Sequence, residues 1–200
     1  MNEEQTVFLV DDDPAVLRSL SALVKVVFPR VEKYESAAAF LQAYTPGRPG
    51  CLVLDVAMPG MSGLELQRKL ADDHVDLPVI FITGHGNVQM AVGAMRAGAV
   101  NFLEKPFREQ ELWDNIRTAL DLDARNRGRQ SRRRLAEQCM AQLTSTERRV
   151  LDLILEGKIN KEIAAELQVS LRTVEDRRAR VMKKMGAGSL AELIQLALAR

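Results

Sequence analysis

Short apolar runs alternate with longer amphipathic stretches over the first 120 residues of the chain. Three of the runs are continuous, with no polar residue between the apolar ones: Val7-Phe8-Leu9-Val10, Leu52-Val53-Leu54 and Val79-Ile80-Phe81-Ile82. Two weaker runs lie at 31–34 and 100–103. Continuous apolar runs of this length are typical of parallel strands that are buried on both faces of a sheet.

Helical spacing separates these runs. Val16, Leu20, Leu23 and Val27 recur on one face of a first helix. Further helices are expected at 36–43, 62–72, 87–97 and 108–121. The alternation predicts an α/β domain whose five parallel strands have helices on both faces, in the flavodoxin-like order 2-1-3-4-5.

From residue 143 onward the pattern is helical throughout. Thr144 and Glu147 form a capping box at the start of a helix over 145–155. Three more helices are expected at 160–167, 171–185 and 190–199, with a short turn at 168–170 between the first two of them. The pattern predicts a small all-α domain that contains a helix-turn-helix.

A polar, arginine-rich segment lies between the two patterns and contains Gly128. We interpret it as a linker that is partly helical by extension of the preceding helix. Its arginines are either a solvated face or a direct contact to nucleic acid. The predicted organisation is one domain at 1–122, a linker at 123–140 and a second domain at 141–200.

Charge separates the same two parts. The formal net charge of the whole chain is +1, but it is −5 up to Leu120 and +6 from Asp121 onward. A basic second half indicates a polyanionic partner. Cys51 and Cys139 suggest neither a disulfide framework nor a metal site, which fits a reducing cytoplasm. No apolar run approaches the roughly 20 residues that span a bilayer, so we expect no membrane segment.

Polar side chains follow the apolar runs where each strand ends, and the carboxyl ends of parallel strands meet at one edge of a sheet. Crowded carboxylates favour a hard divalent cation such as Mg²⁺, beside which an aspartate can accept a phosphoryl group. A lysine adds positive charge and a threonine hydroxyl can donate a hydrogen bond to the phosphoryl group. The residues at these ends are Asp11, Asp12, Asp13, Asp55, Thr83 and Lys105.

The motifs VFLVDDD, VLDVAMPGMSGLEL, VIFITGHG and AGAVNFLEKPF resemble, in this order, the receiver domains of two-component response regulators. The resemblance covers about residues 5–122. It implies that Asp55 accepts the phosphoryl group and that Lys105 contacts it, with a cis bond between Lys105 and Pro106. It further implies that Mg²⁺ is held by Asp11, Asp12, Asp55 and the backbone carbonyl of Ala57, and that Thr83 and Phe102 form the switch.

The helix expected at 171–185 is basic on one face, as in helices that enter the DNA major groove. Val174, Val181 and Met185 form the opposite, apolar stripe, and the position of Arg178 is left unassigned. A bundle of four helices with a solvated charged face is the alternative that the pattern alone leaves open. The candidate DNA-binding residues are Arg172, Thr173, Asp176, Arg177, Arg180 and Lys184.

The stretches LTSTERRVL, NKEIAAEL, VSLRTVE and KKM resemble the DNA-binding domain of the LuxR/NarL type, and the whole layout resembles the FixJ branch of response regulators. The resemblance implies DNA, a sensor histidine kinase and RNA polymerase as partners. It also implies a homodimer when phosphorylated, transcriptional activation and no dedicated enzyme activity. That branch usually has histidine at the position of Arg177 and a small polar residue at that of Arg180, so the DNA site read here is expected to differ.

Two rival functions are compatible with parts of the sequence. A phosphatase of the haloacid-dehalogenase type would use Asp11 as nucleophile and Asp13 as acid/base, but it leaves Asp55 and the basic half without a role. A regulator that works without phosphorylation would use the first domain only as a dimerisation scaffold. The acidic first half and basic second half also suggest that docking of the two inhibits the unphosphorylated state.

Overall fold

A computed structural model of the chain describes residues 5–84 and 88–198. The chain splits into two compact units, Met1–Asn126 and Arg127–Arg200. Each unit has its own hydrophobic core: two clusters lie in the first and one in the second. The units are described separately below.

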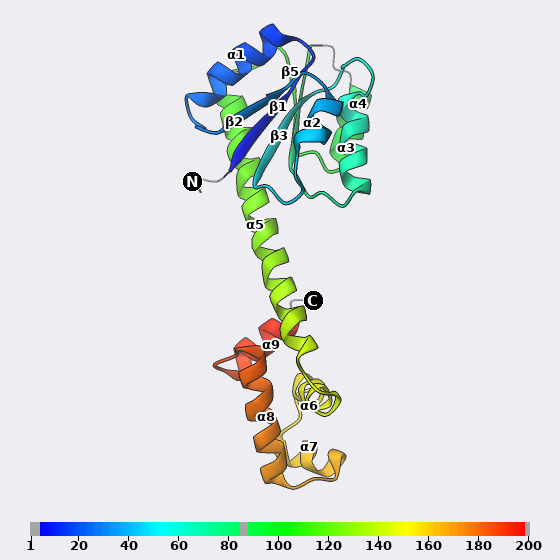
Figure 1. Cartoon of the computed structure of the whole chain (residues 1–200), viewed down its shortest axis with the longest axis vertical. Coiled ribbons are helices and arrows are strands. Elements are labelled where there is room, and N and C mark those ends of the chain that lie inside the picture. The colour runs from blue at the N-terminus through cyan, green and yellow to red at the C-terminus, as the bar shows by residue number, and fades with distance from the viewer. Residues whose placement is uncertain (1–4, 85–87, 199–200) are drawn as a thin grey trace. The chain divides into compact units, whose positions relative to one another are not determined.

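The first unit contains a parallel sheet in the order β2-β1-β3-β4-β5, as the sequence predicts. Helices cover both faces, with α1 and α5 on one side and α2, α3 and α4 on the other (Figure 1). The strands are β1 (Thr6–Val10), β2 (Val31–Tyr34), β3 (Gly50–Asp55), β4 (Val79–Thr83) and β5 (Asn101–Glu104). The helices are α1 (Pro14–Lys25), α2 (Ala37–Ala43), α3 (Gly63–Asp72), α4 (Val88–Arg96) and the first part of α5 (Glu109–Ala141), which continues past Asn126 into the second unit.

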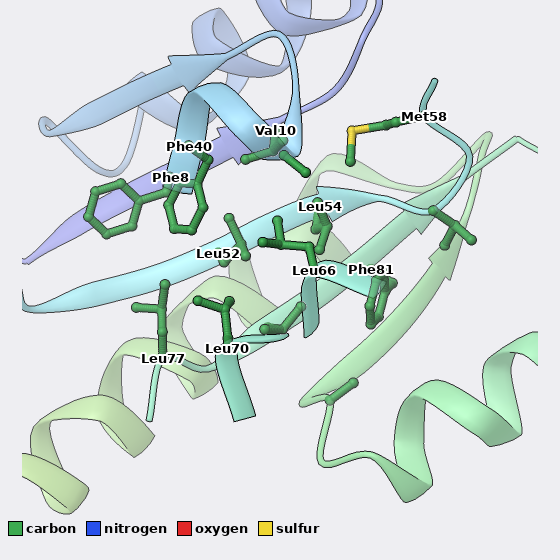
Figure 2. Close-up of a cluster of buried hydrophobic side chains, with 14 of the residues drawn as sticks. Phe8, Val10, Phe40, Leu52, Leu54, Met58, Leu66, Leu70, Leu77 and Phe81 are labelled. Atoms are coloured by element: carbon green, nitrogen blue, oxygen red, sulfur yellow. The ribbon is translucent and has the colours of Figure 1, made fainter. Parts of the chain in front are cut away.

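The central strand β3 is buried along its whole length, which explains its continuous apolar run. Successive side chains of a strand point to opposite faces of the sheet. Leu52 and Leu54 accordingly pack in the cluster under α2 and α3, whereas Cys51 and Val53 pack in the cluster under α1 and α5. Figure 2 shows Leu52 and Leu54 together with Leu66 of α3 in the first of these clusters.

Helix α5 continues through Gly128 to Ala141, so the linker that was expected to be partly helical is helical throughout. A glycine inside a helix costs only about 1 kcal/mol relative to alanine, and the neighbouring residues are mostly good helix formers. Side-chain bonds one turn apart add support, because Arg132 Nε donates to the Gly128 carbonyl and Arg133 pairs with Glu137 at 3.0 Å.

Asp123 fastens the middle of α5 to the start of β3, one residue beyond the expected end of the first domain. Its side chain is 2% exposed, and Oδ2 accepts the Gly50 amide at 3.0 Å. The backbones approach closely at this point, because a Cβ on Gly50 would lie 2.0 Å from the Thr6 carbonyl oxygen. Asp123 therefore belongs to the packed part of the first unit, which explains why that unit extends to Asn126.

The second unit is helical, and its helices begin and end close to the residues expected from the sequence. Ser170 caps the third helix, because its hydroxyl accepts the Thr173 amide at 3.1 Å. Gln168 takes a left-handed backbone conformation between the two helices of the helix-turn-helix, with a φ of 52°. The helices are α6 (Ser145–Leu155), α7 (Asn160–Leu167), α8 (Leu171–Met185) and α9 (Leu190–Leu198), and residue 199 of the predicted last helix lies outside the described residues.

An ion pair joins the end of α8 to the start of α6. The Thr144–Glu147 capping box is present as expected, with the Thr144 amide donating to Glu147 Oε2 at 2.9 Å. Lys184 Nζ donates to the same carboxylate at 2.6 Å and to the Gln142 carbonyl at 3.1 Å. One carboxylate thus holds two elements that are far apart in the chain.

No helix within the described ranges is both long and apolar enough to cross a membrane.

Asp123→Ala should lower the free energy of unfolding of the first unit by about 1–3 kcal/mol, because it removes an acceptor from the buried Gly50 amide. Urea unfolding followed by the fluorescence of Trp113, the single tryptophan, measures the change. Asp121→Ala, at an exposed position on the same helix, is the matched control. Equal stability of the two variants would contradict a fastening role for Asp123.

Stability of the second unit should depend on the ionisation of Glu147. The Lys184 ammonium, helped by the Thr144 amide, holds the pKa of Glu147 at about 2, below its ordinary value of 4.5. The Glu147 carboxylate takes up a proton more readily in the unfolded chain than in the folded one. The stabilisation that ionised Glu147 gives the folded unit is therefore complete above pH 4.5 and is lost as the pH falls towards 2. Calorimetry should show the stability advantage of wild type over Glu147→Gln shrinking across this window. Glu175→Gln, at an exposed position, should show no such trend.

Candidate functional site

The carboxyl ends of four strands carry the residues that the sequence singles out. Asp11 follows β1 and Asp55 is the last residue of β3. Thr83 is the last residue of β4, and Lys105 follows β5. Because β1, β3, β4 and β5 are parallel neighbours, these residues lie at the same edge of the sheet, as expected.

Lys105 bridges two of the carboxylates. Its ammonium donates to Asp11 Oδ2 at 3.0 Å and to Asp55 Oδ1 at 3.1 Å. The side chains of Asp11 and Asp55 are only 4% and 10% exposed, so their charges are poorly solvated and need a cation beside them. The structure therefore brings together three of the predicted site residues.

The loop after β3 fixes the second oxygen of Asp55. The Ala57 amide donates to Asp55 Oδ2 at 2.7 Å. The loop turns back tightly, because the Gly63 amide donates to the Val56 carbonyl at 3.0 Å and a Cβ on Gly63 would lie 2.2 Å from the Asp55 carbonyl oxygen. The close approach requires glycine at the start of α3, whereas the Asp55 side chain is oriented by its hydrogen bonds from the Ala57 amide and Lys105.

Burial and neighbouring charges have opposite effects on the pKa values of Asp55 and Lys105. Burial raises the pKa of Asp55 above its ordinary value, although the hydrogen bonds from Lys105 and Ala57 oppose the shift. Burial would lower the pKa of Lys105, but its hydrogen bonds to Asp11 and Asp55 outweigh that effect and raise it. The cation is thus firmly protonated at neutral pH.

The remaining acidic residues sit differently. Asp12 and Asp13 are exposed, and Asp13 caps α1 by accepting the Ala15 amide at 2.7 Å. Asp11 Oδ1 accepts the Asp13 amide at 3.0 Å, which orients the Asp11 carboxylate. Among the residues that the structure describes, no group of three acidic, histidine or cysteine side chains is assembled for a metal. Mg²⁺ needs only one or two carboxylates beside water and carbonyl oxygens, so the two carboxylates that do lie together on Lys105, those of Asp11 and Asp55, fit it.

Thr83 and Phe102 lie on adjacent strands beside the site. Thr83 is 1% exposed, and its carbonyl accepts the Lys105 amide at 2.7 Å. Phe102 is half-buried and packs against Phe81, with 6.2 Å between the ring centroids. His85, in the motif VIFITGHG, lies outside the described residues.

The candidate DNA-binding residues of α8 fall into two groups. Arg172, Asp176 and Arg180 are exposed, and Thr173 and Arg177 are partly exposed. Lys184 is instead tied to Glu147 within the unit, so its ammonium already has a structural role. The sequence pattern placed Lys184 on the exposed face because helical periodicity does not reveal a partner on another helix.

Arg178, which the sequence left unassigned, turns away from that face. Its Nη1 donates to Asn160 Oδ1 at 2.5 Å, which links α8 to the start of α7. The apolar stripe of α8 is buried as expected, with Val174 and Val181 at 0% exposure. The face that α8 leaves open is therefore the basic one.

Comparisons with known proteins agree with both units. Residues 7–117 match the response regulator receiver domain, and residues 141–197 match the bacterial regulatory proteins of the luxR family. The chain is 43% identical over 195 residues to the response regulator protein TmoT of Ectopseudomonas mendocina, covering 98% of this chain and 89% of that protein. It is 44% identical to the transcriptional regulatory protein FixJ of Azorhizobium caulinodans, covering 99% of this chain and 94% of that one.

A solved structure of the response regulator StyR superposes on the chain with a TM-score of 0.88 and 43% sequence identity, over 98% of this chain and 100% of that one. The receiver fold, the helix-turn-helix and these full-length relatives lead to one assignment. The chain belongs to the two-component response regulators that regulate transcription, with a receiver domain followed by a DNA-binding domain of the luxR type.

Proposed function

We propose that a sensor histidine kinase phosphorylates Asp55 and that this modification controls DNA binding through α8. The observation that carries the proposal is the Lys105 ammonium, which lies within 3.1 Å of both Asp11 and Asp55 at the carboxyl edge of the sheet. This arrangement presents a buried carboxylate beside a fixed cation, which is what phosphoryl transfer to an aspartate requires. Asp11, Asp12, Asp55 and the Ala57 carbonyl are the proposed Mg²⁺ ligands.

Asp55, Ala57 and Lys105 have different roles in the proposed phosphoryl transfer. An Asp55 oxygen attacks the phosphorus, the bond from phosphorus to the kinase histidine breaks, and the histidine leaves with the electron pair of that bond. Ala57 holds the other Asp55 oxygen by its amide, and Lys105 exchanges a carboxylate partner for a phosphoryl oxygen. Mg²⁺, when bound, neutralises the charge that develops on the phosphoryl oxygens.

The switch follows from the new group at Asp55. The Thr83 hydroxyl ends the neighbouring strand and donates to the phosphoryl group, and Phe102 changes rotamer beside it. Phe102 has room to respond because it is only half-buried. The surface formed by α4 and β5 then changes shape and pairs two copies of the chain, which brings two α8 helices to two half-sites of DNA.

DNA recognition is proposed for five residues of α8: Arg172, Thr173, Asp176, Arg177 and Arg180. Lys184 is omitted because it is paired with Glu147. We propose that the bound dimer acts in the cytoplasm and activates transcription by contacting RNA polymerase. The relatives described as transcriptional regulatory proteins support the role in transcription.

Incubation with Mg²⁺ and a small phosphodonor should place one phosphoryl group on Asp55, detected by mass spectrometry after borohydride trapping. The same treatment should strengthen DNA binding, and Asp55→Asn should abolish both effects. Asp13→Asn, which changes a helix cap outside the pocket, is the matched control and should still be phosphorylated. A label on Asp11 would support the phosphatase alternative. Modification of Asp55 without any change in DNA affinity or oligomeric state would support the scaffold alternative.

Arg172→Ala, Arg177→Ala and Arg180→Ala should each weaken DNA binding. An arginine that reads a base should cost about 1–3 kcal/mol and relax sequence specificity, whereas one that contacts a phosphate should lower the slope of affinity against salt by about 1. Fluorescence anisotropy at several salt concentrations separates these cases. Arg30→Ala removes the same charge from an exposed site in the receiver and should leave the slope unchanged. Wild-type behaviour of all three α8 variants would exclude this face as the DNA contact.

A further inference from the structure

Helix α4 is attached to the rest of the first unit mainly at its C-terminal end. Ala94 is the one buried residue among Val88–Arg96. Val88, at the opposite end, is 80% exposed. Ala99, just after the helix, is buried and belongs with Ala94 to the cluster under α2 and α3. A helix with so little burial is held by few contacts, so the contacts at its buried end largely determine its position.

Gln67 makes the hydrogen bonds that hold this end, from α3, the helix beside α4 (Figure 1). Its Nε2 donates to the Ala97 carbonyl at 3.2 Å and to the Ala94 carbonyl at 3.4 Å. Gly98 follows with a φ of 89°, and the Ala99 amide donates back to the Ala94 carbonyl at 3.0 Å. The last carbonyls of a helix have no partner within it, so a donor from a neighbouring helix can cap them. The cap of α4 is thus supplied by a residue far from it in the chain.

Burial of the Gln67 amide has a cost. The residue is only 5% exposed, and its Oε1 is the single buried side-chain oxygen or nitrogen within the described ranges that has no hydrogen-bond partner. A buried acceptor without a partner lowers stability. An unbranched apolar side chain of similar length, such as methionine, would fill the same place without this cost. Packing alone therefore does not account for the amide, and its distinctive contribution is the pair of bonds to α4.

The two ends of α4 lead to different parts of the proposed switch. Thr83 ends β4 at the phosphorylation site, and α4 begins after it at Val88, in the exposed part of the helix. The C-terminal end leads to β5, which carries Phe102. A change at Thr83 therefore reaches α4 at its loosely packed end, while Gln67 holds the buried end. A helix that is held at one end and displaced at the other tilts about the held end.

We propose that Gln67 is a positioning residue of the switch, which holds the C-terminal end of α4 so that phosphorylation of Asp55 tilts the helix into one defined position. The inference rests on the proposed function, in which the surface of α4 and β5 pairs two copies of the phosphorylated chain. Without the two Gln67 bonds, α4 samples more positions, and a smaller fraction of the phosphorylated chains presents the surface that dimerises. The apparent affinity of the dimer falls in proportion to that fraction.

Gln67→Met tests the hold on α4 in the untreated full-length chain, because it removes both bonds and nearly keeps the side-chain length. Hydrogen exchange of the Ala97, Gly98 and Ala99 amides, which close the end of α4, should become about tenfold faster. Leu70→Met is the matched control, because Leu70 is buried on α3 and lines the same cavity of about 240 Å³ as Gln67. Its exchange should stay as in wild type. Unchanged exchange in Gln67→Met would overturn the proposal.

The same variants are then treated with Mg²⁺ and a small phosphodonor. Gln67→Met should be phosphorylated on Asp55 to the same extent as wild type, because Gln67 contacts α4 and not the pocket. The dissociation constant of its phosphorylated dimer, measured by analytical ultracentrifugation, should be about tenfold higher. Leu70→Met should dimerise as wild type does. A residue with a merely structural role would change the melting temperature without separating phosphorylation from dimerisation.

Three results of the dimerisation experiment would contradict the proposal. Equal dimerisation of phosphorylated Gln67→Met and wild type would show that α4 does not need the two bonds. An equal loss in Leu70→Met would assign the effect to packing. Stronger dimerisation of Gln67→Met without the phosphodonor would mean that the bonds hold α4 in its inactive position. Failure of the proposed function is seen separately, in wild type, as phosphorylation of Asp55 that leaves the oligomeric state unchanged.

Discussion

The shared contact of Lys105 with Asp11 and Asp55 is the constraint on which the receiver depends. Two carboxylates that are almost fully buried need a cation beside them, because burying a charge without a partner is costly. Lys105 supplies that cation from the end of the edge strand β5, which β4 separates from β3. The strand order places Asp11, Asp55 and Lys105 at one edge of the sheet, and the tight turn at Gly63 shapes the loop that follows Asp55.

Strand order and the ends of the strands could be predicted from the sequence because they follow from local patterns. The continuous apolar runs at β1, β3 and β4 require burial on both faces, and β3 shows why, with Leu52 and Cys51 in different clusters. The capping box at Thr144 and the cap at Ser170 are likewise local, so the helices of the second unit begin where expected.

The features that the sequence left unpredicted involve contacts between residues far apart in the chain. Asp123 bonds to an amide 73 residues away, and Lys184 pairs with a carboxylate 37 residues away. The pattern of a polar, arginine-rich segment predicts that an aspartate within it is exposed. The pattern of a basic helix predicts that a lysine on it contacts DNA. Only the packed structure shows that Asp123 is buried and that Lys184 has an acidic partner.

The start of α7 departs from these local patterns. Side-chain caps begin α1, α2, α3, α6 and α8, whereas the cap position of α7 is Ile159, whose side chain has no acceptor and is mostly exposed. Glu162 holds this helix start instead, because its carboxylate accepts the Ile159 amide at 2.9 Å, and Arg178 of α8 donates to Asn160 in the next position. The start of α7 therefore depends on contacts with neighbouring residues, which the identity of the cap residue alone does not reveal.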